Sequence, residues 1–369
     1  MKFFLSCALL LLLIACNKNN CELHDVIFYN PDDKANISVP QNIFSSIQII
    51  SLKCPDEIIV DPEGDVIYKE NKFYCVDFKR NRVDIFDSDG LYICSVASQG
   101  RSGNEYLGIA GVQVIDDCVA IYSYHNKAVY YYDIDGTFVR KDPIECNPMN
   151  LLKNGNYYWG YTGFSNGKIS ERVVKMNSDG QIIEKYMPSN AAIIPMEERG
   201  DVFIIHDGDV LIRESFCNKI SCINKMGQVE TFLKFDFGKY NVPDKYFKYS
   251  DPYTAAQKLL NSDFAIMERF FINQNHLVLS VNFQFGSQEG KIISSLGVES
   301  NGKWRWLKSE KEGTLSMFFS STRQMTSDSD VVLLVDGERV REFAAGYPEL
   351  VGEFDDTTDN PCIVLCRLK

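Results

Sequence analysis

Short runs rich in β-branched and aromatic residues alternate with polar breaks along most of the chain. In FYCVDFKRNRVDIFDSDGLYICSV (residues 73–96), two such runs flank a short polar break, and an Asp-Gly pair precedes a third run. The same order recurs in residues 118–141, 157–186, 202–235 and 277–308. Runs of this length and composition, separated by turn residues, predict antiparallel strands in a repeated unit.

The turn glycines of the five units measure the repeat. They are Gly90, Gly136, Gly180, Gly227 and Gly302, with successive gaps of 46, 44, 47 and 75 residues. The last gap holds an insertion, NVPDKYFKYSDPYTAAQKLLNSD, whose TAAQKLL core predicts one short helix near residues 243–262. Removing roughly 28 residues restores a period of about 45, which is typical of a four-stranded propeller blade.

These units predict an all-β fold, a six-bladed β-propeller of four-stranded antiparallel blades, with seven blades as an alternative. Residues 315–343 supply the sixth unit. A propeller closes its ring by pairing strands from its two ends. The C-terminal PCIVLCRLK can pair with either DVIFYN (residues 25–30) or IQIISL (residues 47–52). We expect one propeller domain over residues 23–369, acting as a monomer.

The first residues, MKFFLSCALLLLLIAC, are typical of a bacterial lipoprotein signal. Lys2 precedes an apolar run of thirteen residues, 3–15, which is too short to cross a bilayer as a helix. Leu13-Ile14-Ala15-Cys16 matches a lipobox, so we expect cleavage of residues 1–15, lipid on Cys16 and a tether over residues 16–22. The alternative is an ordinary signal peptide with an incidental cysteine. The expected location is the outer membrane, on its periplasmic or its surface side.

Charge and cysteine usage exclude some classes of function. The net charge is −12, and −13 without Lys2, which argues against nucleic acid because phosphate binding requires clustered Lys and Arg. Twelve cysteines include Cys7 in the signal and the lipid-bearing Cys16, and the remaining ten show no zinc-site spacing. Cys217 and Cys222 can pair across a turn. No metal or cofactor is expected.

The loop GRSGNEY (residues 100–106) is the first candidate for chemistry. It lacks the Gly-Lys-Ser/Thr of a phosphate-binding loop, and a β-like run follows it instead of a helix. One interpretation is a connection between blades, in which Arg101 and Glu105 form a charge-assisted bond. The other is the rim of a ligand site, in which Arg101, Glu105 and Tyr106 bind an anionic or sugar ligand.

A stripe of aromatic residues is the second candidate. Tyr157, Trp159 and Tyr161 alternate along one strand-like run and therefore share a face. They either pack between blades or form a platform on which a sugar stacks, with Trp159 and Tyr161 as the candidate ligand residues.

Other motifs carry less weight. Gly163-Phe164-Ser165-Asn166-Gly167 matches a nucleophile elbow only formally, because a hairpin loop is expected there. The Asp-x-Asp-Gly pairs read as hairpin turns. Four scattered histidines and acidic residues such as Glu197, Glu198 and Asp201 form no recognisable catalytic pattern, so no catalytic or metal-binding residue is assigned.

The chain resembles the six-bladed β-propeller lipoproteins of Bacteroides-type bacteria. The matching features are the lipobox, the unit at residues 73–96, the GRSGNEY loop and the ending DNPCIVLCRLK. In that family the loop reads like G-R-G-P-G-E-Y, so this chain departs from it at Ser102, Gly103 and Asn104. The resemblance covers most of the chain, least around residues 240–262, and implies the fold and the anchor.

The expected function is binding of a glycan, a peptide or a partner protein through loops on one face. The alternative is an enzyme, of hydrolase, lyase or lactonase type, with a site in the central funnel that works with or without a metal. Carboxylates or histidines converging on a metal would favour the enzyme. A third alternative is a structural subunit of an envelope complex, which would show a broad apolar face.

Overall fold

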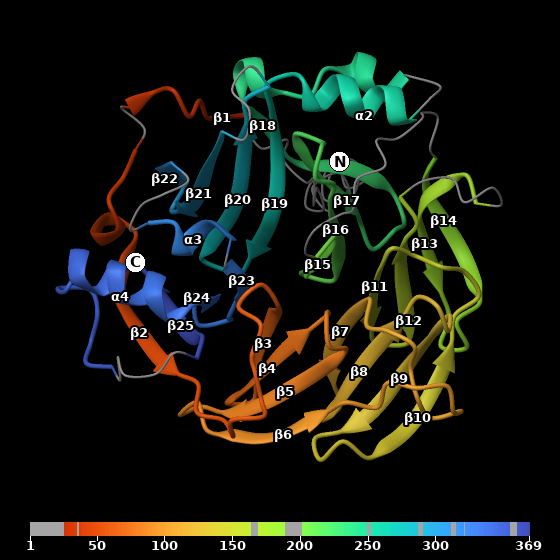
Figure 1. Cartoon of the computed structure of the whole chain (residues 1–369). Helices are drawn as coiled ribbons and strands as arrows, with labels where there is room; N and C mark the ends of the chain where they lie inside the picture. The colour runs from red at the N-terminus through yellow and green to blue at the C-terminus, as the bar shows by residue number, and fades with distance from the viewer. Residues whose placement is uncertain are drawn as a thin grey trace, which may run out of the picture.

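The structure, a computed structural model, is a ring of six four-stranded antiparallel sheets (Figure 1). It describes residues 26–34, 37–163, 169–188, 201–248, 252–286, 291–310, 315–320, 322–354 and 360–369. The predicted all-β, six-bladed propeller is therefore confirmed, and the alternative of seven blades is wrong. Cys16, the signal peptide and the tether lie outside the described residues.

Blades 1 to 5 each run outward from the axis with their four strands in chain order. Blade 1 contains β3 (Asp65–Lys69), β4 (Lys72–Asp77), β5 (Arg82–Asp87) and β6 (Tyr92–Val96). Blade 2 contains β7 (Gly111–Ile115), β8 (Cys118–Ser123), β9 (Ala128–Asp133) and β10 (Phe138–Pro143). Blade 3 contains β11 (Asn150–Asn154), β12 (Tyr157–Tyr161), β13 (Glu171–Met176) and β14 (Ile182–Pro188).

Blades 4 and 5 continue the pattern, with an insertion between them. Blade 4 contains β15 (Phe203–His206), β16 (Asp209–Arg213), β17 (Lys219–Ile223) and β18 (Val229–Asp236), and β1 (Ile27–Phe28) adds to its outer edge. The insertion contains η3 (Gly238–Tyr240), η4 (Asp244–Lys248) and α2 (Pro252–Leu260), which confirms the predicted helix. Blade 5 contains β19 (Phe264–Ile272), β20 (His276–Gln284), β21 (Ile292–Ser300) and β22 (Lys303–Glu310).

Blade 6 closes the ring with strands from both ends of the chain. Its order from the axis outward is β23 (Thr322–Met325), β24 (Asp330–Val335), β25 (Cys362–Leu368) and β2 (Phe44–Ser51), with η2 (Pro40–Asn42) before β2 and α3 (Met317–Ser320) before β23. Of the two predicted closing segments, IQIISL is the one that pairs with PCIVLCRLK. DVIFYN instead forms β1, parallel to β18.

The five turn glycines all lie between the third and fourth strands of their blades and all have positive φ. Gly180 shows why the residue matters, because a Cβ there would come within 1.9 Å of the backbone oxygen of Pro143 in the preceding blade. The hairpins that the sequence predicted are therefore also points of contact between blades.

Blade 6 departs from the prediction after β24. Residues 315–343 were expected to form one unit of strands, but α4 (Gly337–Gly346) begins at the Asp336-Gly337 pair. The side chain of Asp336 accepts a hydrogen bond from the backbone N–H of Arg339 at 3.0 Å, which caps the helix. Val340 and Phe343 bury one face of α4, so the third strand comes only later, as β25.

The blades pack face to face through apolar clusters, and side chains also link their innermost strands. Gln324 of blade 6 accepts a hydrogen bond from the Tyr68 backbone N–H at 2.6 Å and donates to the Tyr68 carbonyl at 3.3 Å. Gln113 of blade 2 makes the same pair of bonds with the backbone of Lys153 in blade 3, at 2.7 and 3.4 Å. Each glutamine therefore satisfies backbone groups of a neighbouring blade.

All nine cysteines in the described part of the chain are thiols. Cys217 and Cys222 form no disulfide with each other, and Cys362 and Cys366 are buried on β25. They act as small apolar side chains of the core.

Candidate functional site

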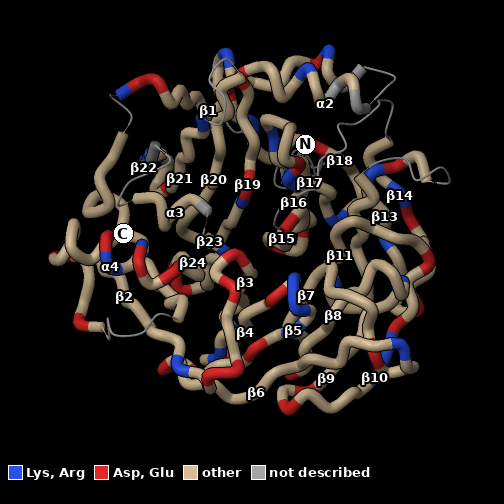
Figure 2. Tube along the Cα trace, in the orientation of Figure 1, with Lys and Arg blue, Asp and Glu red and all other residues tan. Residues whose placement is uncertain are grey.

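A cavity of about 1190 Å³ follows the axis of the ring. Each innermost strand begins where the chain arrives from the preceding blade, so the starts of these strands and the connections between blades form one end of the cavity, which we call the funnel mouth. The loops between second and third strands reach the same end. Acidic and basic residues lie around the axis, including on β3 and β19 (Figure 2).

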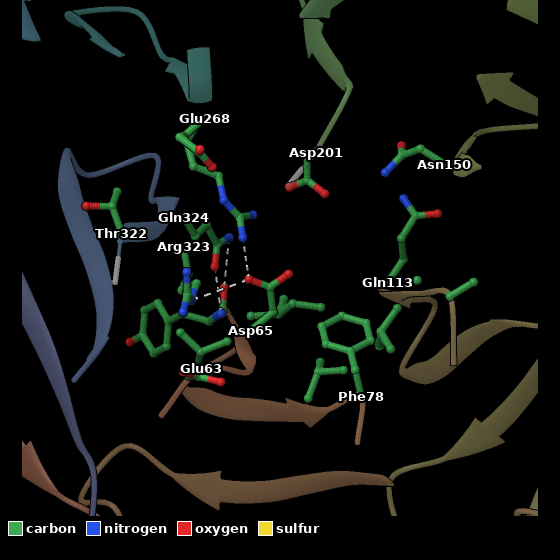
Figure 3. A pocket seen from close by; sticks show the side chains of 18 of the residues that line it. Glu63, Asp65, Phe78, Gln113, Asn150, Asp201, Glu268, Thr322, Arg323 and Gln324 are labelled. Atoms are coloured by element: carbon green, nitrogen blue, oxygen red, sulfur yellow. Dashed lines mark hydrogen bonds and ion pairs between the residues drawn. The ribbon is translucent and has the colours of Figure 1, made fainter. Parts of the chain in front are cut away.

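Two arginines meet one carboxylate in the funnel. Arg269 Nη2 of blade 5 lies 2.8 Å from Asp65 Oδ1 of blade 1, and Arg323 Nε of blade 6 lies 3.5 Å from the same oxygen (Figure 3). The Asp65 side chain is 27% exposed, whereas Arg269 and Arg323 are 12% and 9% exposed. The carboxylate is therefore more open to the cavity than the two guanidinium groups that contact it.

Burial and the neighbouring charges shift the pKa values of the two arginines in opposite directions. Burial works against the charge of Arg269, but the carboxylates of Asp65 and Asp201 outweigh it and raise its pKa. Burial lowers the pKa of Arg323, and the nearby Arg269 adds to this effect although Asp65 opposes it.

Each of the two arginines lies in or directly beside a β-bulge. The pairing of β19 with β20 shifts register between Met267 and Arg269, so that Glu268 and Arg269, although consecutive, both line the cavity. The pairing of β23 with β24 shifts between Thr322 and Gln324, and Arg323 is the extra residue. The other four innermost strands, β3, β7, β11 and β15, pair without a shift. Bulges are frequent next to functional sites because they redirect side chains.

Asp201 adds a second carboxylate at the mouth, just before β15. Asp201 is exposed to the space of the funnel. The protein around this space partly removes water from the carboxyl group, and this burial raises the pKa of Asp201 although the charge of Arg269 opposes the shift. Its backbone oxygen accepts a hydrogen bond from Nε of the buried Arg213 at 3.2 Å. Figure 3 shows Asp201 and Asp65 pointing into the same space.

Amides and one aromatic ring complete the lining. Asn282 donates to Glu268 Oε1 at 3.0 Å, and Gln113 and Asn150 line the wall opposite Arg323 (Figure 3). The Phe78 ring, in the loop between β4 and β5, is 40% exposed at the mouth.

Ion pairs hold the rim of the mouth. Lys79 lies 2.7 Å from Glu63 and 3.0 Å from Asp61, and Arg339 lies 3.2 Å from Asp336. The Lys79 pairs join the loop between β4 and β5 to the segment before β3, whereas the Arg339 pair lies within the start of α4.

The GRSGNEY loop connects β6 with β7 on the mouth face. The Glu105 carboxylate accepts a hydrogen bond from the Ser102 backbone N–H at 2.9 Å, and the backbone amides of Ser102 and Arg101 lower its pKa. The Arg101 guanidinium is exposed and, among the described residues, makes no ion pair with Glu105, so the expected charge-assisted bond is absent. Tyr106 is buried against Tyr130 and Tyr132.

The structure supports the loop's role as a connection, because its contacts hold its own backbone. None of Arg101, Glu105 and Tyr106 lines the funnel. Ligand binding by these residues stays a prediction, for which the exposed Arg101 is the most accessible.

The aromatic stripe packs between blades 3 and 4. Trp159 is 6% exposed and stacks on Tyr186, and Tyr161 is 3% exposed and donates to Glu214 at 2.9 Å. Tyr157 is 42% exposed, with Lys175 Nζ 4.4 Å from its ring centre. Trp159 and Tyr161 do not line the funnel, and their role in ligand binding also stays a prediction.

Several other candidates can be placed or set aside. In the described ranges no group of three or more His, Cys, Asp or Glu residues is placed to hold a metal ion. Ser165, Glu197 and Glu198 lie outside the described residues. No helix in the part of the chain that is described is long and apolar enough to cross a membrane.

The sequence reasoning missed Asp65, Arg269 and Arg323. One signal was available, because Glu268-Arg269 interrupts the apolar run FAIMERFFI with two consecutive charges. A strand that alternates regularly would put one of these charges into the core, so the pair indicates a bulge. Asp65 and Arg323 carried no such signal.

Solved structures with the same architecture exist. A protein described as an exported protein of Bacteroides fragilis NCTC 9343 superposes with a TM-score of 0.68 at 13% identity, over 93% of this chain and 99% of that one. A member of the duf4221 family from Bacteroides vulgatus ATCC 8482 gives a TM-score of 0.54 at 8% identity, over 89% and 99%. Both likenesses show the fold alone.

A virginiamycin B lyase from Staphylococcus aureus gives a TM-score of 0.43 at 11% identity, over 88% of this chain and 99% of that one, and supports no inference about activity. No curated protein matches the chain. One family model matches residues 27–367, which is nearly the whole described propeller. The chain belongs to the family described as a domain of unknown function, DUF4934.

Proposed function

We propose that this protein is a binding module outside the cytoplasm, anchored by lipid on Cys16, that takes a glycan into the funnel mouth. The observation that carries the proposal is the pair of carboxylates, Asp65 and Asp201, that point into one open space, with Arg269 and Arg323 in contact with Asp65. The exported-protein neighbour is consistent with a location outside the cytoplasm.

The chemistry of the lining suits a ligand with many hydroxyl groups. A sugar hydroxyl can donate to a carboxylate and accept from a guanidinium or an amide at the same time, and the site offers all three kinds of group. The ion pairs keep Asp65 oriented before any ligand arrives, which lowers the cost of ordering the site. The exposed Phe78 ring supplies an apolar face for a sugar ring.

The size of the cavity favours an oligomer. Sites for drug-sized ligands occupy about 300–1,000 Å³, whereas this cavity measures about 1190 Å³. The connections between blades that surround it, including the loop of Arg101, provide a rim that a longer chain can contact.

The test is a binding screen by thermal shift and calorimetry with neutral, amino and acidic oligosaccharides, together with short peptides. A ligand at 100 times its Kd stabilises the fold by about 2.7 kcal/mol, which shifts the melting temperature measurably. We expect one class of glycan to bind, and Asp201→Asn and Phe78→Ala to weaken it. Asp89→Asn, in the exposed turn between β5 and β6, is the matched control. Binding of peptides alone, or binding unaffected by Asp201→Asn and Phe78→Ala, would contradict the proposal.

One observation favours an enzyme as the second candidate. Asp201 combines exposure to the funnel with a raised pKa, the combination that a general acid requires. Turnover of a bound oligosaccharide that is lost in Asp201→Asn, with binding retained, would support catalysis. Binding without turnover would support the module.

A further inference from the structure

The N-terminal segment is firmly attached to the outer edge of blade 4. β1 pairs in parallel with the end of β18, with Ile27 opposite Phe235 and Phe28 opposite Asp236. Tyr29, 2% exposed, stacks on Trp306 of blade 5 with ring centres 3.9 Å apart, and its hydroxyl lies 2.8 Å from Ser295 Oγ. The point at which the chain joins the propeller is therefore defined.

The same edge exposes apolar side chains. Ile27 and Tyr29 point into the apolar cluster between blades 4 and 5. Side chains alternate between the two faces of a strand, so those of Val26 and Phe28 point outward. Phe28 is 72% exposed and Val26 is 37% exposed. At the other end of β18, Met226 in the turn and Val229 are 78% and 47% exposed. We call these four residues the blade 4 edge.

Basic side chains accompany the blade 4 edge. Lys225 is exposed beside Met226, and Lys234 is exposed on β18, whereas the acidic residues of β18, Glu230 and Asp236, are only partly exposed. The whole chain carries a net charge of −12, so lysines interleaved with exposed apolar residues depart from the average surface. Apolar side chains flanked by lysines are the pattern that binds the interface of an anionic lipid bilayer.

We propose that the blade 4 edge lies on the lipid surface, with Phe28 and Met226 in the interfacial layer and the axis of the funnel along the membrane. This rests on the lipid anchor proposed above. Cys16 precedes Val26 by ten residues, so the tether spans at most about 35 Å even when it is fully extended. The anchored chain therefore brings this edge, ahead of any other, to the bilayer, and the funnel mouth opens sideways to soluble ligands.

The test uses the full-length lipidated chain in vesicles of phosphatidylethanolamine and phosphatidylglycerol that contain brominated phosphatidylcholine. Phe28→Trp and Met226→Trp each place a fluorophore at the blade 4 edge. The native Trp159, Trp304 and Trp306 give the same background in every variant. Ile93→Trp is the matched control, because Ile93 is 45% exposed on the outermost strand of blade 1, diametrically opposite blade 4.

We expect the bromolipid to reduce the added emission of Phe28→Trp and Met226→Trp, and to leave that of Ile93→Trp unchanged. Equal quenching at all three positions, or none at the blade 4 edge, would overturn the orientation. Mass spectrometry of the same preparation tests the anchor separately. Absence of lipid on Cys16 would overturn both, whereas lipid on Cys16 without quenching would overturn this inference alone.

Discussion

Arg269 Nη2 donates to Asp65 Oδ1 across 2.8 Å, and so joins the innermost strands of blades 5 and 1, although the two residues are 204 positions apart in the sequence. Arg323 of blade 6 approaches the same oxygen. One carboxylate thus connects the three blades that meet around the closure of the ring, and it also lies at the centre of the candidate site. The candidate ligand site and the closure of the ring therefore share one group.

Asp65→Asn tests how much this carboxylate contributes to the stability of the closed ring. The variant keeps the size of the side chain but removes the charge that two largely buried guanidinium groups face. Breaking a buried ion pair typically costs 3–5 kcal/mol, and partial exposure of Asp65 reduces this to about 2 kcal/mol. Urea unfolding measures the loss. Asp89→Asn should change the free energy of unfolding by less than about 0.5 kcal/mol, and an equal effect of both variants would contradict the central role of Asp65.

Gln324→Ala tests the link between blades 6 and 1. The change removes two hydrogen bonds and leaves the Tyr68 backbone N–H without its partner, which should cost about 1–3 kcal/mol. Gln113→Ala makes the same change between blades 2 and 3, away from the closure. If closure limits stability, urea unfolding should show the larger loss for Gln324→Ala. Equal losses would show that the junctions are equivalent, and a larger loss for Gln113→Ala would contradict the prediction.

Tyr29 is the main attachment of the N-terminal segment. Tyr29→Phe loses only the contact with Ser295 and should cost about 1 kcal/mol, whereas Tyr29→Ala also loses the stack on Trp306 and should cost about 3–5 kcal/mol. Thermal unfolding distinguishes the two variants. Nearly equal effects would mean that the ring of Tyr29 contributes little.

Asp84 provides a prediction about pH. It is 1% exposed, and burial raises its pKa above the ordinary 3.8 although Ser95 and Arg82 oppose the shift. The folded state therefore holds the proton more tightly than the unfolded chain, and stability decreases as the pH rises from 3.8 to the raised value. Asp84→Asn lacks this titration, so its free energy of unfolding relative to the natural protein should increase across that range and then level off. Unfolding in urea at a series of acidic pH values measures the difference, and a relative stability that falls with rising pH would contradict the sign.

Local features of the sequence determined the blades. Gly90, Gly136 and Gly180 mark hairpins because turns of this type require positive φ, and the apolar runs around them form strands because their side chains alternate between two faces. The closing segment around residues 47–52 was one of two alternatives that the pattern left open. Both segments have strand character, and only pairing with β25 distinguishes them.

Tertiary structure decided the elements whose local signals conflict. Asp336-Gly337 resembles the other hairpin turns in sequence, yet it begins α4, because a helix here buries Val340 and Phe343 against α3 and blade 6. The candidate site was decided in the same way. Asp65, Asp201, Arg269 and Arg323 come from four blades, and they meet only because the ring brings its innermost strands together and two bulges redirect the arginines. Periodicity along a chain specifies which residues share a strand, whereas the residues that share a funnel are specified by how the blades close around it.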